Sequence, residues 1–411
     1  MPETATPPGS ADFGVEKMTF SPPPSASSWR IPAVDGFRAL AMLMVIACHC
    51  WEFGHHPTLY IAPLGWRMEV FGFFKLGGYG VDLFMVLSGF CLFLPLCKSE
   101  EALARFHWKS FYKRRARRII PPYYAAIAFA SLMPFVLVAF YRLLHLKANW
   151  QPLPGSLYDY FAYAFFIQTL SLRSFGHINA SLWSMGLEAQ FYLMFPLVVL
   201  GYRRLGLRFV ALMIGVSILY HLFMESYTVG MAPHQGGLYF IFFLGRWMQF
   251  AAGMLAAWIV AHHRRQDMWR DAKWGTLGVL LSLALYTFTA SIDYPQFLGW
   301  SRPALLALTF ALALVSVCVT RSPLGALVSN RVMEKLGFIS YSVFLIHWPV
   351  VYYFGSLLER LHLHGNALFL ALFPGGTVVT IAMALVFFRL FEKPFLNPPT
   401  PARKEAAAAI A

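Results

Sequence analysis

Charged side chains are scarce in this chain. Asp, Glu, Lys and Arg make up only 13% of the 411 residues, whereas hydrophobic residues make up 58% and the mean hydropathy is +0.56. Soluble domains carry roughly twice this share of charge, so the composition excludes an ordinary soluble protein. The meaning of the net charge of +14 therefore depends on where the basic residues lie relative to the membrane segments. Basic residues beside membrane segments set topology and attract lipid phosphates, so we expect membrane lipids rather than nucleic acid as partners.

Cysteine is also sparse. None of the cysteines shows the C-x-x-C spacing of a metal site, and their number is odd. We interpret them as small buried hydrophobes and expect neither a disulfide nor a metal site. The five are Cys48, Cys50, Cys91, Cys97 and Cys318.

A secretory signal is missing as well. The first 36 residues are rich in Pro and Ser but lack a basic region, an apolar region and a small-residue cleavage site. We expect residues 1–36 to form a disordered cytoplasmic tail, and the first membrane helix to target the chain.

The sequence contains many long apolar segments. Segments of about 17 to 25 apolar residues can cross a bilayer as helices. The expected fold class is an all-α polytopic membrane protein, a bundle of about ten transmembrane helices in one membrane domain at 37–391, followed by a cytoplasmic tail at 392–411. The predicted spans are 37–54, 80–97, 119–142, 183–202, 209–225, 239–261, 274–290, 303–320, 337–354 and 367–391.

An eleventh segment, 157–170, is shorter and carries polar residues such as Asp159 and Gln168. If it does not cross and the amino terminus is cytoplasmic, most of the 33 Lys and Arg residues face the cytoplasm, as the positive-inside rule favours. We therefore predict a short re-entrant or interfacial segment near 157–170. Both termini are then cytoplasmic, in a multi-pass protein of the plasma (inner) membrane.

Arg38 and His49 are the most informative pair. They are separated by ten residues of the first span, and eleven helical steps place both on one face, roughly 16 Å apart along the axis. Ionisable residues inside a membrane are costly and usually mark a functional site. The alternative for His49 is an imidazole that only packs between helices.

Four further ionisable residues are predicted to lie in the outer half of the membrane, near the depth of His49. They are Asp82, Glu188, Arg246 and His347. Simpler explanations exist for three of them. Asp82 can cap a helix, His347 can cap a helix broken by proline, and Arg246 can pair with a carboxylate such as Glu188.

A basic cluster opens the third span. Guanidinium groups at positions i and i+3 share one helix face and can bind phosphate. Arg115 and Arg118 form one such pair, and Arg114 and Arg117 form another. The alternative is a topology anchor that contacts lipid phosphates.

Five motifs, in order from about residue 33 to 395, resemble the integral-membrane acyltransferase family 3, the multi-pass O-acyltransferases of surface carbohydrates, peptidoglycan and some natural products. They are Asp35-Gly-Phe-Arg38 with His49 following, the segment Gly80–Gly89, Arg115-x-x-Arg118-x-x-Pro121, Leu182–Tyr192 around Glu188, and Gly337–Ser342 running into His347-Trp348-Pro349.

The resemblance implies that Arg38 and His49 are the family's catalytic pair, and that Arg115 and Arg118 are its cytoplasmic RxxR motif. The family often has two acidic residues where this chain has Glu188-Ala189, so only Glu188 is carried over. Some relatives add a secreted hydrolase-like domain after the last span. About 20 residues remain here, so we expect transfer to be completed in the membrane domain or by a separate protein.

The favoured hypothesis is an enzyme, an O-acyltransferase with no bound cofactor. It moves an acyl group, expected to be acetyl, from acyl-CoA (acetyl-CoA) as donor substrate to a hydroxyl of a carbohydrate, glycosylated or small-molecule acceptor. His49 acts as general base with Arg38, and Glu188 orients it. Predicted donor-binding residues are Arg114, Arg115, Arg117 and Arg118, and predicted acceptor-binding residues are Asp82, Arg246 and His347.

The second hypothesis is a proton-coupled transporter or exporter of a polar or acylated metabolite. It would use His49, Glu188 and Arg246 as a proton relay. Transporters often show internal repeats, and the two halves of this sequence show none on inspection. A third reading is a membrane scaffold that retains catalytic residues. The sequence leaves the acceptor's identity and the oligomeric state open.

Overall fold

The structure is a computed structural model that describes residues 31–61, 68–143, 145, 154–231, 239–263, 271–291, 301–320 and 322–396. The chain divides into two units, and every described residue belongs to the unit Ile31–Pro398. Residues 1–30 and 397–411, which hold most of the two predicted tails, lie outside the described residues.

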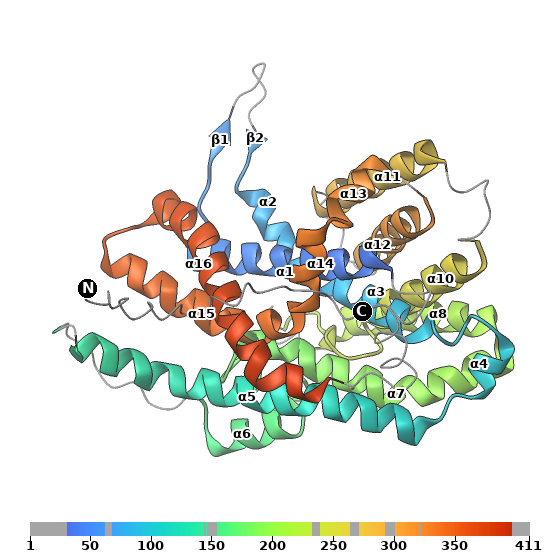
Figure 1. Ribbon diagram of the computed structural model, residues 1–411, viewed down its shortest axis with the longest axis horizontal. Coiled ribbons are helices and arrows are strands. Elements are labelled where there is room, and N and C mark those ends of the chain that lie inside the picture. Colours follow the sequence, from blue (N-terminus) through green and yellow to red (C-terminus); the bar gives the residue numbers. More distant parts are fainter. Residues whose placement is uncertain are drawn as a thin grey trace, which may run out of the picture. The chain divides into compact units, whose positions relative to one another are not determined.

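Helices make up nearly all regular structure in this unit (Figure 1). A helix satisfies its backbone N–H and C=O groups by internal hydrogen bonds, whereas the hydrocarbon core of a membrane offers these groups no partners. One exception is a short antiparallel hairpin of β1 (Tyr60–Ile61) and β2 (Met68–Glu69), with Tyr60 opposite Glu69. The α-helices are α1 Pro32–Phe53, α2 Gly72–Lys75, α3 Gly80–Phe93, α4 Glu100–Ala104, α5 Trp108–Leu143, α6 Leu157–Ala164, α7 Trp183–Leu205, α8 Leu207–Tyr227, α10 Trp247–His263, α11 Ala272–Ser291, α12 Ser301–Val319, α13 Pro323–Val328, α14 Arg331–Phe338, α15 Ser340–Arg360 and α16 Gly365–Phe387. Shorter turns are η2 Leu76–Tyr79, η3 Gln168–Leu170, η4 Ala180–Leu182, the π-helical η7 Phe388–Glu392 and η8 Lys393–Phe395.

Among the described residues, eight helical segments are long and apolar enough to cross a membrane. The all-α polytopic fold is thereby confirmed, while the number ten stays a prediction. The two predicted spans without such a segment, 239–261 and 274–290, overlap the 17-residue α10 and the 20-residue α11. The eight are Pro32–Phe53, Phe73–Phe93, Trp108–Leu143, Ala180–Leu205, Leu207–Tyr227, Ser301–Val319, Ser340–Arg360 and Gly365–Phe395.

Three helix starts differ from the predicted spans by five residues or more. α1 begins at Pro32, inside the stretch assigned to the tail, because proline is favoured in the first helical turn. α5 has 36 residues, about 54 Å, so its basic cluster is helical rather than part of a preceding loop. α10 begins at Trp247, which leaves Arg246 in the turn before the helix and not within a span.

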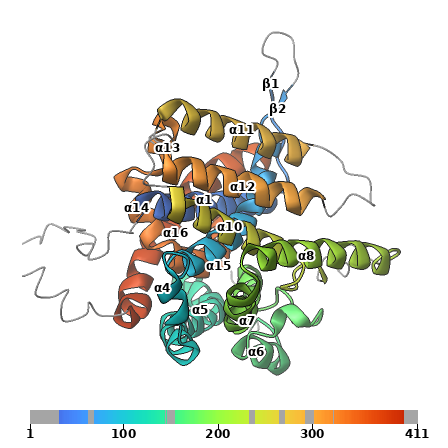
Figure 2. The same cartoon turned by 90° about the vertical axis from the view of Figure 1, so that its right-hand side faces the viewer.

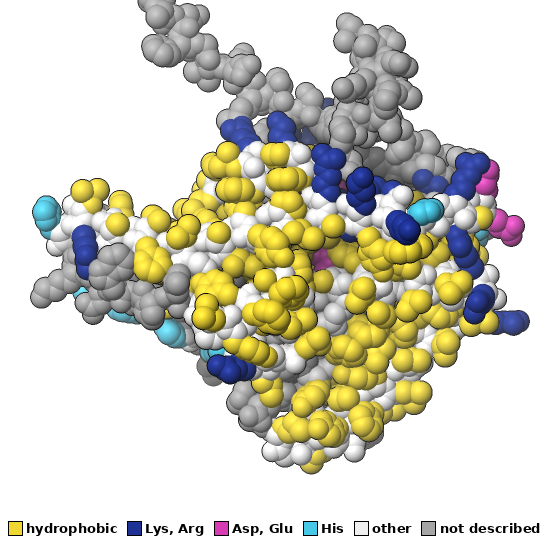
Figure 3. Space-filling model, turned by 90° about the horizontal axis from the view of Figure 1, so that it is seen from below, with side chains coloured by type: hydrophobic (Ala, Val, Ile, Leu, Met, Phe, Trp, Pro, Cys, Tyr) yellow, Lys and Arg dark blue, Asp and Glu magenta, His cyan; other side chains and the backbone are white. Residues whose placement is uncertain are grey.

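The surface agrees with a membrane environment. Figure 3 shows a face covered mostly by hydrophobic side chains, with most Lys and Arg side chains along its upper and right-hand edges. Large apolar side chains of α5 and α7 are among the exposed ones, including Leu132 (58%), Val136 (60%) and Leu193 (61%). An exposed apolar surface of this kind is typical of contact with lipid, and a basic edge is typical of a membrane boundary.

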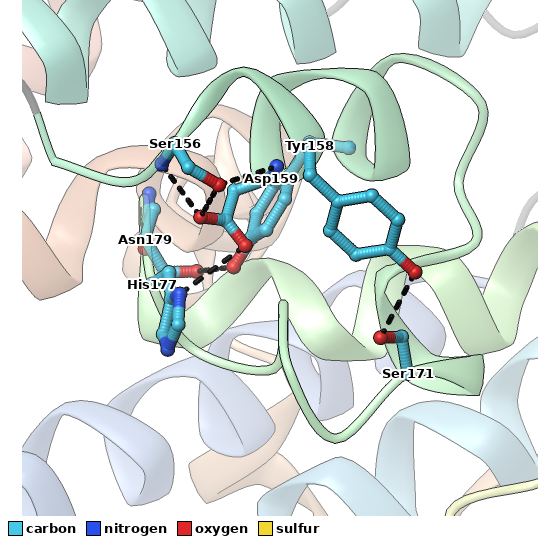
Figure 4. A network of polar contacts seen from close by, with 7 residues as sticks. Ser156, Tyr158, Asp159, Ser171, His177 and Asn179 are labelled. Atoms are coloured by element: carbon cyan, nitrogen blue, oxygen red, sulfur yellow. Dashed lines mark hydrogen bonds and ion pairs between the residues drawn. The ribbon is translucent and has the colours of Figure 1, made fainter.

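The segment 157–170 does not form a membrane-spanning helix. α6 has eight residues, about 12 Å, which is too short to cross. Figure 4 shows how it is fixed: Ser156 and Asp159 form a capping box, and His177 lies 3.2 Å from the Asp159 carboxylate. Burial raises the pKa of Asp159, but hydrogen bonds from Ser156 and the contact with His177 outweigh it, so the pKa is lowered overall.

Close backbone approach fixes the base of α1. A Cβ on Gly36 would lie 1.8 Å from the Val328 carbonyl oxygen, and one on Gly337 would lie 1.8 Å from the Asp35 carbonyl oxygen. Only glycine allows these contacts with α13 and α14. The close packing therefore fixes the backbone just before Arg38.

In Figure 2, α11 and α12 lie above α1 and α10, and α5, α6 and α7 lie below them.

Candidate active site

A cavity of about 110 Å³ brings together residues of α1, α3, α5, α7 and α15. We call it the arginine cavity, because Arg38, Arg115 and Arg118 line it together with Glu188. Helical spacing explains its walls. On α3 the lining residues recur every three or four positions, so one face of the helix is turned to the cavity. They are Val81, Phe84, Met85, Leu87, Ser88, Cys91 and Leu92.

Two of the three arginines keep an unpaired charge. Within the described part of the chain, Arg115 and Arg118 have no carboxylate within 4.0 Å. Arg115 instead lies over the rings of Phe111 and Tyr192, at 5.7 and 5.1 Å. Arg38 donates to Asp35 at 3.2 Å. The cavity therefore carries excess positive charge that suits an anionic ligand.

The second predicted arginine pair faces elsewhere. Arg114 and Arg117 are exposed and do not line the cavity, whereas Arg115 and Arg118 are half-buried. Both pairs have the same i, i+3 spacing, so spacing alone could not distinguish them. The α5 face that packs against the bundle includes Phe111, Arg115 and Arg118.

Glu188 belongs to the arginine cavity and not to His49. Its carboxylate accepts a short hydrogen bond from the Tyr192 hydroxyl, one helical turn away. Tyr192 in turn carries Arg115 over its ring. Glu188 therefore positions the Tyr192 ring, against which Arg115 packs.

His49 has a different carboxylate partner, which the sequence reasoning missed. Its Nδ1 lies 2.8 Å from Glu52 Oε2, because residues at i and i+3 share a helix face. We therefore correct the expectation that Glu188 orients His49. A carboxylate only accepts, so Nδ1 carries the proton and Nε2 holds the lone pair. The His49 side chain is 20% exposed and does not line the arginine cavity.

His347 connects His49 to the arginine cavity. Its ring stacks on His49, with centroids 5.4 Å apart, and lies 5.3 Å from Phe344, which lines the cavity. His347 is 1% exposed, and its Nδ1 lies 2.7 Å from the Phe344 carbonyl oxygen. Its Nε2 is buried and has no partner among the described residues. An unsatisfied buried acceptor is costly, which is typical of a binding or catalytic group.

His347 does not cap a broken helix. α15 continues through Pro349 to Arg360. Proline cannot donate to the carbonyl four residues earlier, and that carbonyl, on Leu345, accepts instead from the side chain of Asn179 at 3.0 Å.

Asp82 and Arg246 form a separate site. Arg246 donates to Asp82 and not to Glu188, which corrects the suggested pairing. Gln249 donates to the same Asp82 oxygen at 2.9 Å. The pairing follows from the tight contact of α3 with α10, where a Cβ on Gly89 would lie 2.1 Å from the Phe250 carbonyl oxygen. Asp82 and Arg246 line a second cavity of about 470 Å³.

Of the predicted site residues, the structure therefore joins Arg38, Arg115, Arg118 and Glu188 in one cavity. It joins His49 to His347, and Asp82 to Arg246. No group of three or more His, Cys, Asp or Glu residues in the described ranges could hold a metal ion.

The comparisons decide the family. A family model described as an acyltransferase domain matches residues 31–389. The chain belongs to this family. The match covers nearly all of the described unit, including both cavities and the histidine pair. No solved structure matches the chain significantly.

Curated relatives carry related names. The peptidoglycan O-acetyltransferase OatA of Listeria monocytogenes is 26% identical over 78% of this chain and 49% of its own length. The putative peptidoglycan O-acetyltransferase YrhL of Bacillus subtilis is 26% identical over 89% of this chain and 54% of its own. A putative O-acetyltransferase of Staphylococcus aureus is 23% identical over 92% and 58%. The chain thus spans about half the length of these acyltransferase relatives.

Proposed function

We propose that the chain is a membrane-embedded O-acyltransferase that moves an acetyl group from acetyl-CoA to a hydroxyl of a carbohydrate. Membership of the acyltransferase family and the names of the relatives support this proposal. The observation that carries it is the arginine cavity, where Arg115 and Arg118 have no carboxylate within 4.0 Å among the described residues.

The arginines bind the donor. Guanidinium groups form bidentate, charge-assisted hydrogen bonds with phosphate oxygens. Arg115 and Arg118 hold the CoA phosphates, and Glu188 supports Arg115 through Tyr192. The cavity of about 110 Å³ is far smaller than a whole CoA molecule, so in this proposal Arg115 and Arg118 hold the phosphates where the cavity opens, and only the narrow thioester arm enters it.

His49 acts as the base, and Glu52 fixes its ring. The proton of the acceptor hydroxyl moves to His49 Nε2 while the oxygen bonds to the thioester carbonyl carbon. The carbon–sulfur bond then breaks, and His49 returns the proton to the CoA thiolate. Arg38 lines the arginine cavity, into which the thioester arm of the donor extends. His347 Nε2, which is buried and has no partner in the described part of the chain, accepts a hydrogen bond from the substrate.

The orientation follows from charge. We place both termini in the cytoplasm of a plasma-membrane protein, so the basic start of α5 meets cytoplasmic acetyl-CoA. The exposed Arg114 and Arg117 do not bind the donor in this proposal; they contact lipid phosphates.

The test uses the full chain in proteoliposomes with acetyl-labelled acetyl-CoA and chitotetraose, a soluble oligosaccharide, and without an ion gradient. We expect release of free CoA in step with acetylated oligosaccharide. No acetyl transfer under these conditions, together with movement of a solute once an ion gradient is imposed, would contradict the proposal and favour a transporter.

A further inference from the structure

The second cavity differs from the arginine cavity in its balance of charge. It contains two carboxylates, two guanidiniums and one imidazole, together with three aromatic side chains. The described residues that line it carry no excess of one sign, so phosphate gains little from them compared with the arginine cavity. Its ionisable residues are Asp82, His221, Glu225, Arg246 and Arg302, and its aromatic residues are Tyr79, Trp183 and Phe240.

The arginines of the two cavities lie toward opposite helix ends. Asp82, Trp183 and Arg302 are in the first turns of α3, α7 and α12, and Glu225 is in the last turn of α8. These ends all fall on the outer side in the alternating topology above. The arginines and Tyr341 of the first cavity instead lie in the early parts of α1, α5 and α15, which start on the cytoplasmic side.

One layer of side chains separates the cavities. Val81 lines both of them. Trp183 lines the second cavity, and the next residue, Ser184, lines the arginine cavity. A ligand in the second cavity therefore lies one residue's thickness from the space that the thioester arm would enter.

Polar atoms in and beside the second cavity remain available to a ligand. Asp82 uses one carboxylate oxygen for Arg246 and Gln249, and the other has no hydrogen-bond partner among the described residues. Arg246 Nε and Gln249 Oε1 are buried and lack partners in the same part of the chain. Donors and acceptors next to aromatic faces suit ring hydroxyls and the apolar face of a sugar.

We infer that the second cavity is the acceptor site and binds an uncharged sugar of the carbohydrate from the outer side. This inference rests on the proposed function, because it assigns the acceptor of that reaction to a place. Its volume, about 470 Å³, falls in the usual range for small-molecule sites. The site adds Trp183, His221, Glu225 and Arg302 to Asp82 and Arg246, whereas His347, also predicted from sequence to bind the acceptor, does not line it.

The test measures binding of chitotetraose to the purified full chain in nanodiscs, without acetyl-CoA. Glu225→Gln and Trp183→Phe are mild changes at half-buried positions, and they avoid breaking the buried Asp82–Arg246 pair. The matched control is Glu100→Gln, an exposed residue of α4 that lines neither cavity. Equal melting temperatures establish that the variants fold.

We expect each cavity variant to weaken chitotetraose binding about tenfold, which corresponds to ~1.4 kcal/mol, with the control unchanged. In the transfer assay the KM for chitotetraose should rise while the KM for acetyl-CoA stays constant. Parent-like affinity in both variants would overturn the acceptor site.

The outcomes separate this inference from the proposed function. Acetyl transfer that persists with unchanged acceptor KM in both variants rejects the site and leaves the function standing. Weakened sugar binding in a chain that transfers no acetyl group supports the site and rejects the function. Loss of binding in Arg115→Gln equal to that in Glu225→Gln would also reject the separate acceptor site.

Discussion

The side-chain amide of Asn179 donates to the main-chain carbonyl of Leu345 at 3.0 Å. This carbonyl is the one that Pro349 leaves without its helical donor. The bond connects the segment before α7 to the first third of α15, two residues from His347. Trp183 and Ser184, which lie on either side of the boundary between the cavities, follow directly after this segment.

Asn179→Ala should destabilise the protein by about 1–3 kcal/mol, because the buried Leu345 carbonyl loses its donor and Ser181 loses the acceptor for its amide and hydroxyl. The midpoint of thermal unfolding in detergent measures the loss. Asn366→Ala is the matched control, since Asn366 also donates to a carbonyl, that of Thr58 at 3.0 Å, but from an exposed position. An equal effect in both variants would show that the Pro349 gap is not the cause.

Glu52→Gln should lower kcat about tenfold and leave the KM for acetyl-CoA unchanged, because an amide holds the His49 tautomer less firmly than a carboxylate. Steady-state transfer kinetics measure both constants. Glu359→Gln is the control: it alters another histidine–carboxylate pair, His55 with Glu359 at 3.2 Å, away from both cavities. Parent-like kcat in Glu52→Gln would remove Glu52 from the mechanism.

Arg115→Gln and Arg118→Gln should each raise the KM for acetyl-CoA about tenfold or more, since a charge-assisted hydrogen bond contributes roughly 1.5–3 kcal/mol. Arg114→Gln and Arg117→Gln are the paired controls on the exposed face of the same helix and should change this KM little. The idea fails if all four variants behave alike, which would indicate a general effect of charge at the membrane boundary.

The sequence predicted the helices well and their ends less well. Lipid demands long apolar helices, so the spans follow from hydropathy alone. The start of α5 at Trp108 could not be found this way, because the basic residues that lengthen the helix lower its hydropathy. The β1–β2 hairpin is two residues on each strand and leaves no periodic signal.

The site was predictable where its residues share one helix. Arg115 with Arg118 follows from i, i+3 spacing, and Glu52 could have been found by the same rule from His49. The partner of Arg246 could not, because Asp82 lies 164 positions earlier in the chain. Which carboxylate meets which cation depends on helix packing, and the depth of a residue in the membrane does not fix its neighbours.

The stability of the α6 region should depend on pH through Asp159. Its pKa is lowered in the folded protein, so the ionised carboxylate stabilises the fold. This contribution is present above the unfolded pKa of about 3.9 and is lost as the pH falls through the lower folded value. Melting temperatures of the parent and Asp159→Asn, measured from about pH 7 to 3, should differ above the unfolded pKa and converge as the pH falls below it. A difference that does not shrink between about pH 5 and 3 would contradict this assignment.

The most direct test of the account is the turnover of His49→Ala with acetyl-CoA and chitotetraose in proteoliposomes. General-base catalysis contributes about 10²–10⁴-fold, so we predict that kcat falls by at least about a hundredfold while acetyl-CoA binding is retained. His107→Ala, at an exposed position that lines neither cavity, should match the parent. Parent-like turnover in His49→Ala would contradict the central claim that this imidazole takes the proton from the acceptor hydroxyl.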